Sequence, residues 1–94
     1  MRARYNESLL QWIWQNLEFD VDNLRTQGGH TLQILDPGRK NAGAGPDFLN
    51  ACISLDGLKF YGSVEIHNHE KEWFEHSHQT NPGFNSVILH VVLD

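Results

Sequence analysis

The sequence contains a single cysteine, Cys52, and no apolar run near the ~18 residues that a membrane-spanning helix needs. One cysteine cannot form a disulfide within the chain. The first five residues, Met1 to Tyr5, are basic, but the apolar segment of a signal peptide does not follow them. We therefore expect a cytoplasmic protein with no membrane partner.

Positive charge is also scarce. Seven Lys and Arg residues stand against twelve Asp and Glu residues, which gives a formal net charge of −5. Nucleic-acid binding depends on contacts from Lys and Arg to phosphate, so the chain as a whole does not attract nucleic acid. A phosphate-containing substrate would have to be held by a local group of cations or by a metal ion.

The length of 94 residues and the apolar content of 39% are those of one small globular domain. Such a domain buries only ~60 to 65% of the surface that its unfolded chain exposes. The sequence ends at Val91-Val92-Leu93-Asp94, on an apolar stretch typical of a strand. We expect residues 1–94 to be a single domain and the N-terminal part of a longer protein.

The first predicted element is a helix. Asn6 or Ser8 can cap it, and Ser8 with Gln11 has the spacing of a capping box. Apolar residues at helical spacing predict a buried stripe made of Leu9, Leu10, Ile13, Trp14 and Leu17. The polar residues expected to face water are Gln11, Gln15, Asn16 and Glu18.

Four strands are predicted, at residues 31–35, 48–55, 59–67 and 86–93. Asp56-Gly57 is a strong signal for a hairpin between the second and third strands. The last strand is nearly all apolar, which is typical of a central, parallel strand covered on both faces. With a short helix after Asn68, the order is α-β-β-β-α-β. The expected fold is therefore α/β (α+β), a mixed sheet with flanking helices.

Residues 38–46 contain three glycines and no bulky apolar residue. The Gly-Lys-Ser/Thr ending of a phosphate-binding P-loop is absent. One interpretation is a flexible surface turn. The other is a loop that approaches a ligand closely, in which Arg39, Lys40 and Asn41 belong to the site and the two cations contact phosphate.

Two acids occupy positions that suggest a metal site. Asp47 opens the second strand, and Glu65 lies near the end of the third. Two carboxylates repel each other by about 4 kcal/mol at about 4 Å with an effective dielectric of about 20, so a site that brings them together expects a cation. Mg²⁺ or Mn²⁺ fits, with Asp47, Glu65 and the backbone carbonyl of Ile66 as ligands. His67 is the candidate to orient or deprotonate a water.

This arrangement resembles the PD-(D/E)XK phosphodiesterase superfamily, which has the restriction-endonuclease-like fold. The resemblance rests on the order of elements, on Pro46-Asp47 and on Glu65-Ile66-His67. It implies a nuclease-like hydrolase in which Asp47 and Glu65 bind the metal, with nucleic acid as the candidate substrate. His67 stands where the superfamily has a Lys that positions water and stabilises charge. Lys59 lies about 20 Å along the same strand at ~3.3 Å per residue, too far to replace it.

A narrower resemblance is to an uncharacterised bacterial family of unknown function, whose members are longer proteins. The segments that carry it are Gly45-Pro46-Asp47-Phe48, Gly62-Ser63-Val64-Glu65-Ile66-His67, Trp73-Phe74-Glu75-His76-Ser77-His78 and Val87-Ile88-Leu89-His90-Val91-Val92. This resemblance supports a shared site but implies no reaction.

Two other interpretations remain open. His67-x-His69 and His76-x-His78 have spacings that suit Zn²⁺, which would make the chain a His-ligated metal protein. Alternatively, the missing Lys and the acidic balance favour a non-catalytic binding or scaffold module of the same fold. His90, inside an apolar strand, is expected to be a hydrogen-bonded histidine of the core.

Overall fold

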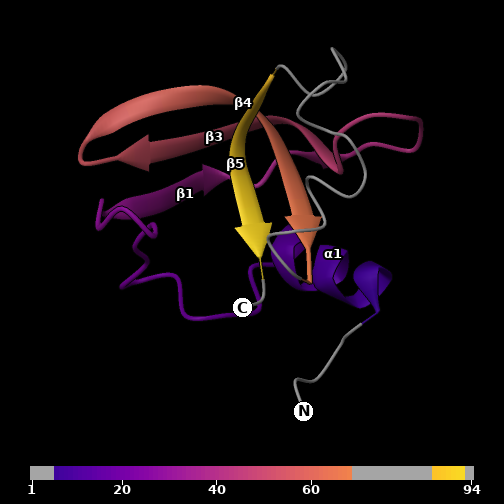
Figure 1. The fold of residues 1–94 in the computed structure, drawn as a ribbon, viewed down its shortest axis with the longest axis horizontal. Coiled ribbons are helices and arrows are strands. Elements are labelled where there is room, and N and C mark those ends of the chain that lie inside the picture. The colour runs from indigo at the N-terminus through magenta and orange to yellow at the C-terminus, as the bar shows by residue number, and fades with distance from the viewer. Residues whose placement is uncertain (1–5, 69–85, 93–94) are drawn as a thin grey trace.

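The computed structural model describes residues 6–68 and 86–92 of the chain. These ranges contain one helix and one mixed sheet, so the protein has a small α+β fold (Figure 1). The elements are α1 (Glu7–Gln15), β1 (Leu32–Asp36), β2 (Arg39–Lys40), β3 (Phe48–Leu55), β4 (Leu58–His67) and β5 (Val87–Val92). In the described part of the chain, no helix has the length and hydropathy needed to cross a membrane.

Helix α1 begins where the capping signal predicts. Asn6 is the N-cap, and its side-chain oxygen accepts a hydrogen bond of 2.7 Å from the backbone N–H of Ser8. Leu10 and Trp14 are buried, whereas Leu9 is 45% exposed, so the buried stripe is narrower than expected. The Trp14 indole N–H also donates to the carbonyl of Pro37 at 2.9 Å, which attaches the helix to the end of β1.

The strands are ordered β1-β3-β4-β5, with the short β2 paired to β3. The β3–β4 hairpin is confirmed: Asp56 and Gly57 have φ of 49° and 89°, the positive values that its turn needs. The parallel direction of β5 beside β4 is also confirmed. Among the described strands, however, β5 ends the order and is half-buried, so the prediction of a central strand covered on both faces is wrong for them.

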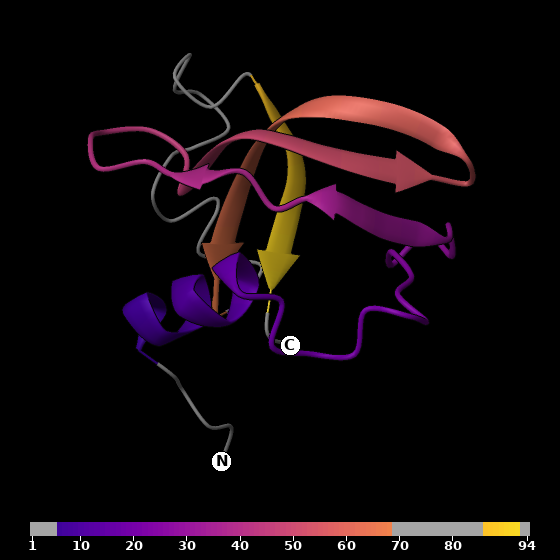
Figure 2. The same cartoon turned by 180° about the vertical axis from the view of Figure 1, so that it is seen from behind.

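Both views of the ribbon place α1 at the carboxyl ends of β4 and β5 (Figures 1 and 2). The apolar core forms where the helix meets the sheet, from Leu10, Trp14, Phe48, Ala51, Val64 and Ile66. Side chains alternate along a strand, so Glu65 and His67 lie on the face of β4 opposite Val64 and Ile66. Both are nonetheless buried, each 3% exposed. Polar side chains at such positions need partners.

Two predicted segments remain, the loop that contains residues 39 and 40 and the short helix after Asn68. Residues 39 and 40 were expected in a loop, but they form β2, because Arg39 and Lys40 pair with Leu49 and Phe48 at the start of β3. The short helix expected after Asn68 lies outside the described residues.

Candidate functional site

Asp47 is the residue on which α1, β3 and β4 converge. It directly precedes β3, and its carboxylate accepts two hydrogen bonds of 2.8 Å: Oδ1 from the Gln11 side-chain amide of α1, and Oδ2 from the backbone N–H of Ile66 in β4. Its backbone carbonyl accepts a third, also of 2.8 Å, from the N–H of Asn41. Asp47 is therefore fixed both in its backbone and in the orientation of its carboxylate.

Glu65 lies against Asp47. Burial raises the pKa of Glu65 from 4.5 to about 9, helped by its hydrogen bond with the Asp47 carboxyl and by the negative charge of that group. The backbone N–H groups of Asp47 and Ile66 lower the pKa, but they do not offset the rise. The raised pKa favours the protonated form of the Glu65 carboxyl in the folded protein.

The third candidate ligand, the carbonyl of Ile66, is on the same side as the acids. In an extended strand the N–H and C=O of one residue point to the same edge. The Ile66 N–H donates to Asp47, so the Ile66 carbonyl also points toward the β3 side of β4. The Asp47 and Glu65 carboxyl groups are thus in contact at the boundary of β3 and β4, and the Ile66 carbonyl is on the same edge of β4 as the N–H that Asp47 binds.

His67 is placed beside this pair and is bonded to a second histidine. Its Nε2 lies 3.9 Å from Glu65 Oε2, which is beyond hydrogen-bond length, and its Nδ1 lies 2.8 Å from His90 Nε2. His90 belongs to β5, where it pairs in register with Glu65. The expected hydrogen bond of His90 is therefore present, and its partner is a candidate site residue.

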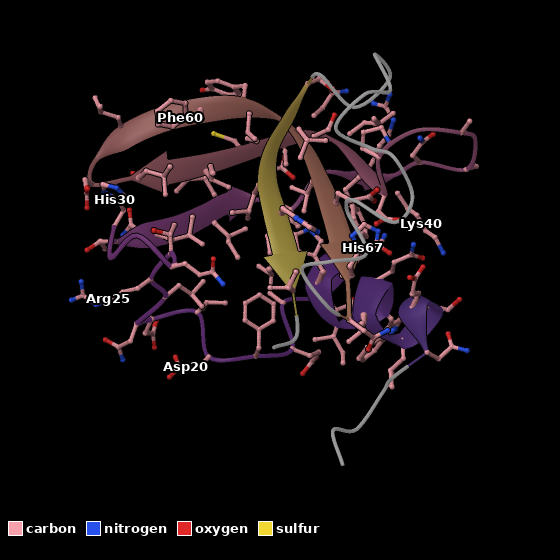
Figure 3. All side chains as sticks on the ribbon, in the orientation of Figure 1. Asp20, Arg25, His30, Lys40, Phe60 and His67 are labelled. Atoms are coloured by element: carbon pink, nitrogen blue, oxygen red, sulfur yellow. The ribbon has the colours of Figure 1, made fainter. Side chains whose placement is uncertain are left out.

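The three candidate site residues between positions 38 and 46 differ in their contacts. Asn41 is occupied by the loop itself: its amide donates to the carbonyls of Ala44 and Pro46, each at 2.9 Å, and its Oδ1 accepts from the N–H of Gly43. Asn41 thus shapes the approach to Asp47. Arg39 and Lys40 are exposed on β2, next to the start of β3. Figure 3 shows Lys40 on the same side of the molecule as His67.

Of the four histidines in the zinc interpretation, the described residues include His67 alone. His69, His76 and His78 lie outside the described residues. Within residues 6–68 and 86–92, no group of three or more His, Cys, Asp and Glu side chains is placed to hold a metal ion. His30 lies on the opposite side of the molecule from His67 (Figure 3), exposed, with its Nδ1 2.6 Å from Asp56 Oδ2. That hydrogen bond lowers the pKa of Asp56.

Two residues of the site were not predicted from the sequence patterns. Gln11 was expected to face water, and this is wrong, because it is half-buried and bonded to Asp47. A signal for it existed: Gln11 lies three residues before Trp14, and side chains three apart share a helix face. His90 was expected in the core rather than beside Glu65, because the register of β5 on β4 is not readable from the sequence.

A cavity of about 650 Å³ lies beside the site but does not contain the acids. Its lining is mainly apolar and comes from α1, from residues 19–34 and from the ends of β4 and β5; it includes Trp14, Phe19, Leu32, His67 and His90. Neither Asp47 nor Glu65 lines it. The two histidines are therefore shared between the cavity and the neighbourhood of the carboxyl pair.

Comparison with known proteins gives one family. Residues 7–94 match the model of a family described as "Protein of unknown function (DUF2851)". No curated protein and no solved structure matches the chain in the corresponding comparisons.

Proposed function

The chain belongs to the DUF2851 family, a family of unknown function, and we propose from its site that it is a divalent-cation-dependent phosphodiesterase of the nuclease-like kind. The observation that carries the proposal is the contact between the carboxyl groups of Asp47 and Glu65. The cation would be Mg²⁺ or Mn²⁺, and the substrate a phosphodiester such as nucleic acid.

The residues present fit a cation. A buried pair of acids that must retain a proton to coexist is stabilised when a cation replaces that proton. Mg²⁺ often takes only one or two protein carboxylates and completes its octahedron with other oxygens. Asp47 and Glu65 would be the carboxylate ligands, and the Ile66 carbonyl the third oxygen. When bound, such an ion polarises a phosphodiester and lowers the pKa of an attacking water.

The protein's own groups would divide the remaining work. Gln11 and the Ile66 N–H hold the Asp47 carboxylate in one orientation, each at 2.8 Å. His67, whose Nε2 faces Glu65, would accept a hydrogen bond from a water and orient it. Arg39 and Lys40 are exposed on β2 beside the start of β3, where they would contact phosphate. They would supply local positive charge that neutral imidazole lacks.

The order of elements supports the same proposal. A helix precedes the sheet, Asp47 directly precedes one strand of an antiparallel hairpin while Glu65 lies on the other, and a parallel strand follows. Within this proposal the described elements would form a restriction-endonuclease-like core, as the PD-(D/E)XK resemblance implies, with β2 as an addition to it. In that core, Asp47 and Glu65 would be the metal ligands, and His67 would stand in the place of the Lys.

The test is cleavage of single- and double-stranded DNA and RNA with Mg²⁺ or Mn²⁺ by the wild-type protein. We expect cleavage that EDTA abolishes and that Asp47→Asn and Glu65→Gln reduce to background. Asp56→Asn is the matched control, because it changes an acid at the far end of the same hairpin and should cleave like the wild type. Cleavage at the wild-type rate by Glu65→Gln would contradict the proposal.

A further inference from the structure

Two buried residues of β3 have a spacing that a regular strand does not allow. Phe48 and Ala51 are both 0% exposed, and both belong to the apolar core between α1 and the sheet. They are three positions apart, whereas side chains on one face of a regular strand are two or four positions apart. An extra residue must therefore lie between them.

The pairing of β3 with β4 locates the extra residue. Phe48 is the register partner of Val64, and Ala51 is the partner of Gly62. Two residues of β3 lie between these pairs, but only one residue of β4 does, which is the arrangement of a β-bulge. Within the bulge, Asn50 has a φ of 58°. Asn adopts this left-handed conformation more readily than most residues, and β-branched residues rarely do.

The strands on the other side of β3 follow the bulge. β2 pairs with β3 before the bulge and β1 pairs with β3 after it, and the chain passes from β1 to β2 at Pro37 and Gly38. A Cβ on Gly38 would lie 2.6 Å from the carbonyl oxygen of Leu49, so glycine is needed where the chain passes this close. The bulge is therefore accommodated by both neighbours of β3.

The bulge decides on which side of the sheet Asp47 lies. Without it, alternation from Ala51 would turn Phe48 toward the side of Glu65 and Asp47 toward the core. With the extra residue, Phe48 enters the core instead. Asp47 is then directed to the side of Glu65, and the two carboxyl groups are in contact.

We propose that Asn50 is a positioning residue for the carboxyl site: its left-handed conformation forms the bulge that turns Asp47 from the core side of the sheet to the side of Glu65. Asn50 is exposed, and it acts through its backbone conformation rather than through a contact with the acids. The effect on metal binding rests on the proposed function. The effect on the placement of Asp47 is independent of it.

Two substitutions at position 50 separate the backbone conformation from the side chain. Asn50→Gly keeps positive φ accessible, whereas Asn50→Val disfavours it. In a regular strand Val is favoured over Asn, so harm from Asn50→Val is specific to the bulge. Gln33→Val is the matched control, because Gln33 is an exposed strand residue whose φ is not positive.

The placement is measured by nuclear Overhauser effects between β3 and β4 in the ¹³C,¹⁵N-labelled protein. We expect a contact between Phe48 and Val64 in the wild type, in Asn50→Gly and in Gln33→Val. Asn50→Val should replace it by a contact between Leu49 and Val64, which is the pairing of a regular strand. Mn²⁺ affinity should fall about 10- to 100-fold in Asn50→Val and stay unchanged in the other two variants.

Deletion of Asn50 tests the same inference without a left-handed residue. One residue then separates Phe48 from Ala51, so alternation alone directs Phe48 to the core and Asp47 to the side of Glu65. We expect the deletion variant to keep the contact between Phe48 and Val64 and to bind Mn²⁺ like the wild type.

Three results would overturn the inference: a wild type that pairs Leu49 with Val64, an Asn50→Val protein with the wild-type contact and Mn²⁺ affinity, or a deletion variant that binds Mn²⁺ no better than Asn50→Val. The wild type and the deletion variant decide the matter if Asn50→Val does not fold. A wild type that binds no Mn²⁺ would contradict the proposed function, and the contacts of Val64 would then decide the placement of Asp47 by themselves.

Discussion

Glu65 is the residue of the site whose burial disfavours its charged form. It is buried beside another acid, and its pKa is raised from 4.5 to about 9. The folded protein therefore retains a proton that the unfolded chain releases near the lower value. The contribution of Glu65 to stability therefore falls as pH rises from about 4.5 toward about 9, because in that interval its folded form binds more protons than its unfolded form.

We predict that Glu65→Gln removes this pH dependence, because its amide is neutral at every pH. Between about pH 5.5 and about pH 8.5, the free energy of unfolding of the wild type should decrease by at least about 1 kcal/mol more than that of Glu65→Gln. Urea denaturation in metal-free buffer measures both. The same slope in the two proteins would show that Glu65 is ionised in the folded state.

Gln11 gives a second prediction at the level of one side chain. Gln11→Ala removes the hydrogen bond to Asp47 Oδ1 and should lower the free energy of unfolding by about 1 to 2 kcal/mol. Gln15→Ala makes the same chemical change at an exposed position of the same helix and should stay within about 0.5 kcal/mol of the wild type. Thermal or urea unfolding compares them, and equal effects would mean that the Gln11 contact contributes nothing.

Among the elements, β5 approaches β4 closely just before its first residue. The N–H of Ser63 donates to the carbonyl of Ser86 at 2.9 Å, and the two serine hydroxyls are 2.9 Å apart. This close approach requires glycine at position 62. A Cβ on Gly62 would lie 2.6 Å from both the Ser86 carbonyl oxygen and Ile88 Cγ2.

Gly62→Ala should therefore separate the start of β5 from β4 and destabilise the fold by about 1 to 3 kcal/mol. Because β5 carries His90, the substitution should also weaken the His67–His90 hydrogen bond. Gly43→Ala is the control, since its Cβ would have only an ordinary contact of 3.8 Å, and it should change stability by less than about 0.5 kcal/mol. Unfolding by urea measures the stability. A Gly62→Ala protein as stable as Gly43→Ala would contradict the tight β4–β5 contact.

At the level of elements, local signals were sufficient for much of the fold. Asn6 marked the start of α1, Asp56-Gly57 marked the hairpin, and the apolar run in β5 indicated a parallel strand. The sequence did not reveal β2 or the irregularity at Asn50, which has a φ of 58° and shifts the β3–β4 register. Both depend on pairing with a distant strand, and a pattern of side-chain polarity does not specify that pairing.

The molecule as a whole combines a negative net charge with exposed cations on β2, beside the start of the strand that Asp47 precedes. The two acids that the sequence singled out lie in contact because the hairpin brings the start of β3 next to the end of β4. Their supporting residues come from α1 and β5, the elements farthest apart in the described chain. The spacing from Trp14 could have placed Gln11 on the buried side of α1, but its contact with Asp47 and the contact of His90 with His67 follow from tertiary packing and were found only in the structure.

The most direct measurement is isothermal titration of Mn²⁺ into the metal-free protein, because the account depends on Asp47 and Glu65 sharing one divalent cation. We predict one Mn²⁺ per wild-type chain, no binding at the same concentrations to Glu65→Gln, and unchanged binding to Asp56→Asn. A wild-type protein that binds no Mn²⁺ or Mg²⁺, or a Glu65→Gln protein that binds Mn²⁺ as tightly as the wild type, would contradict it.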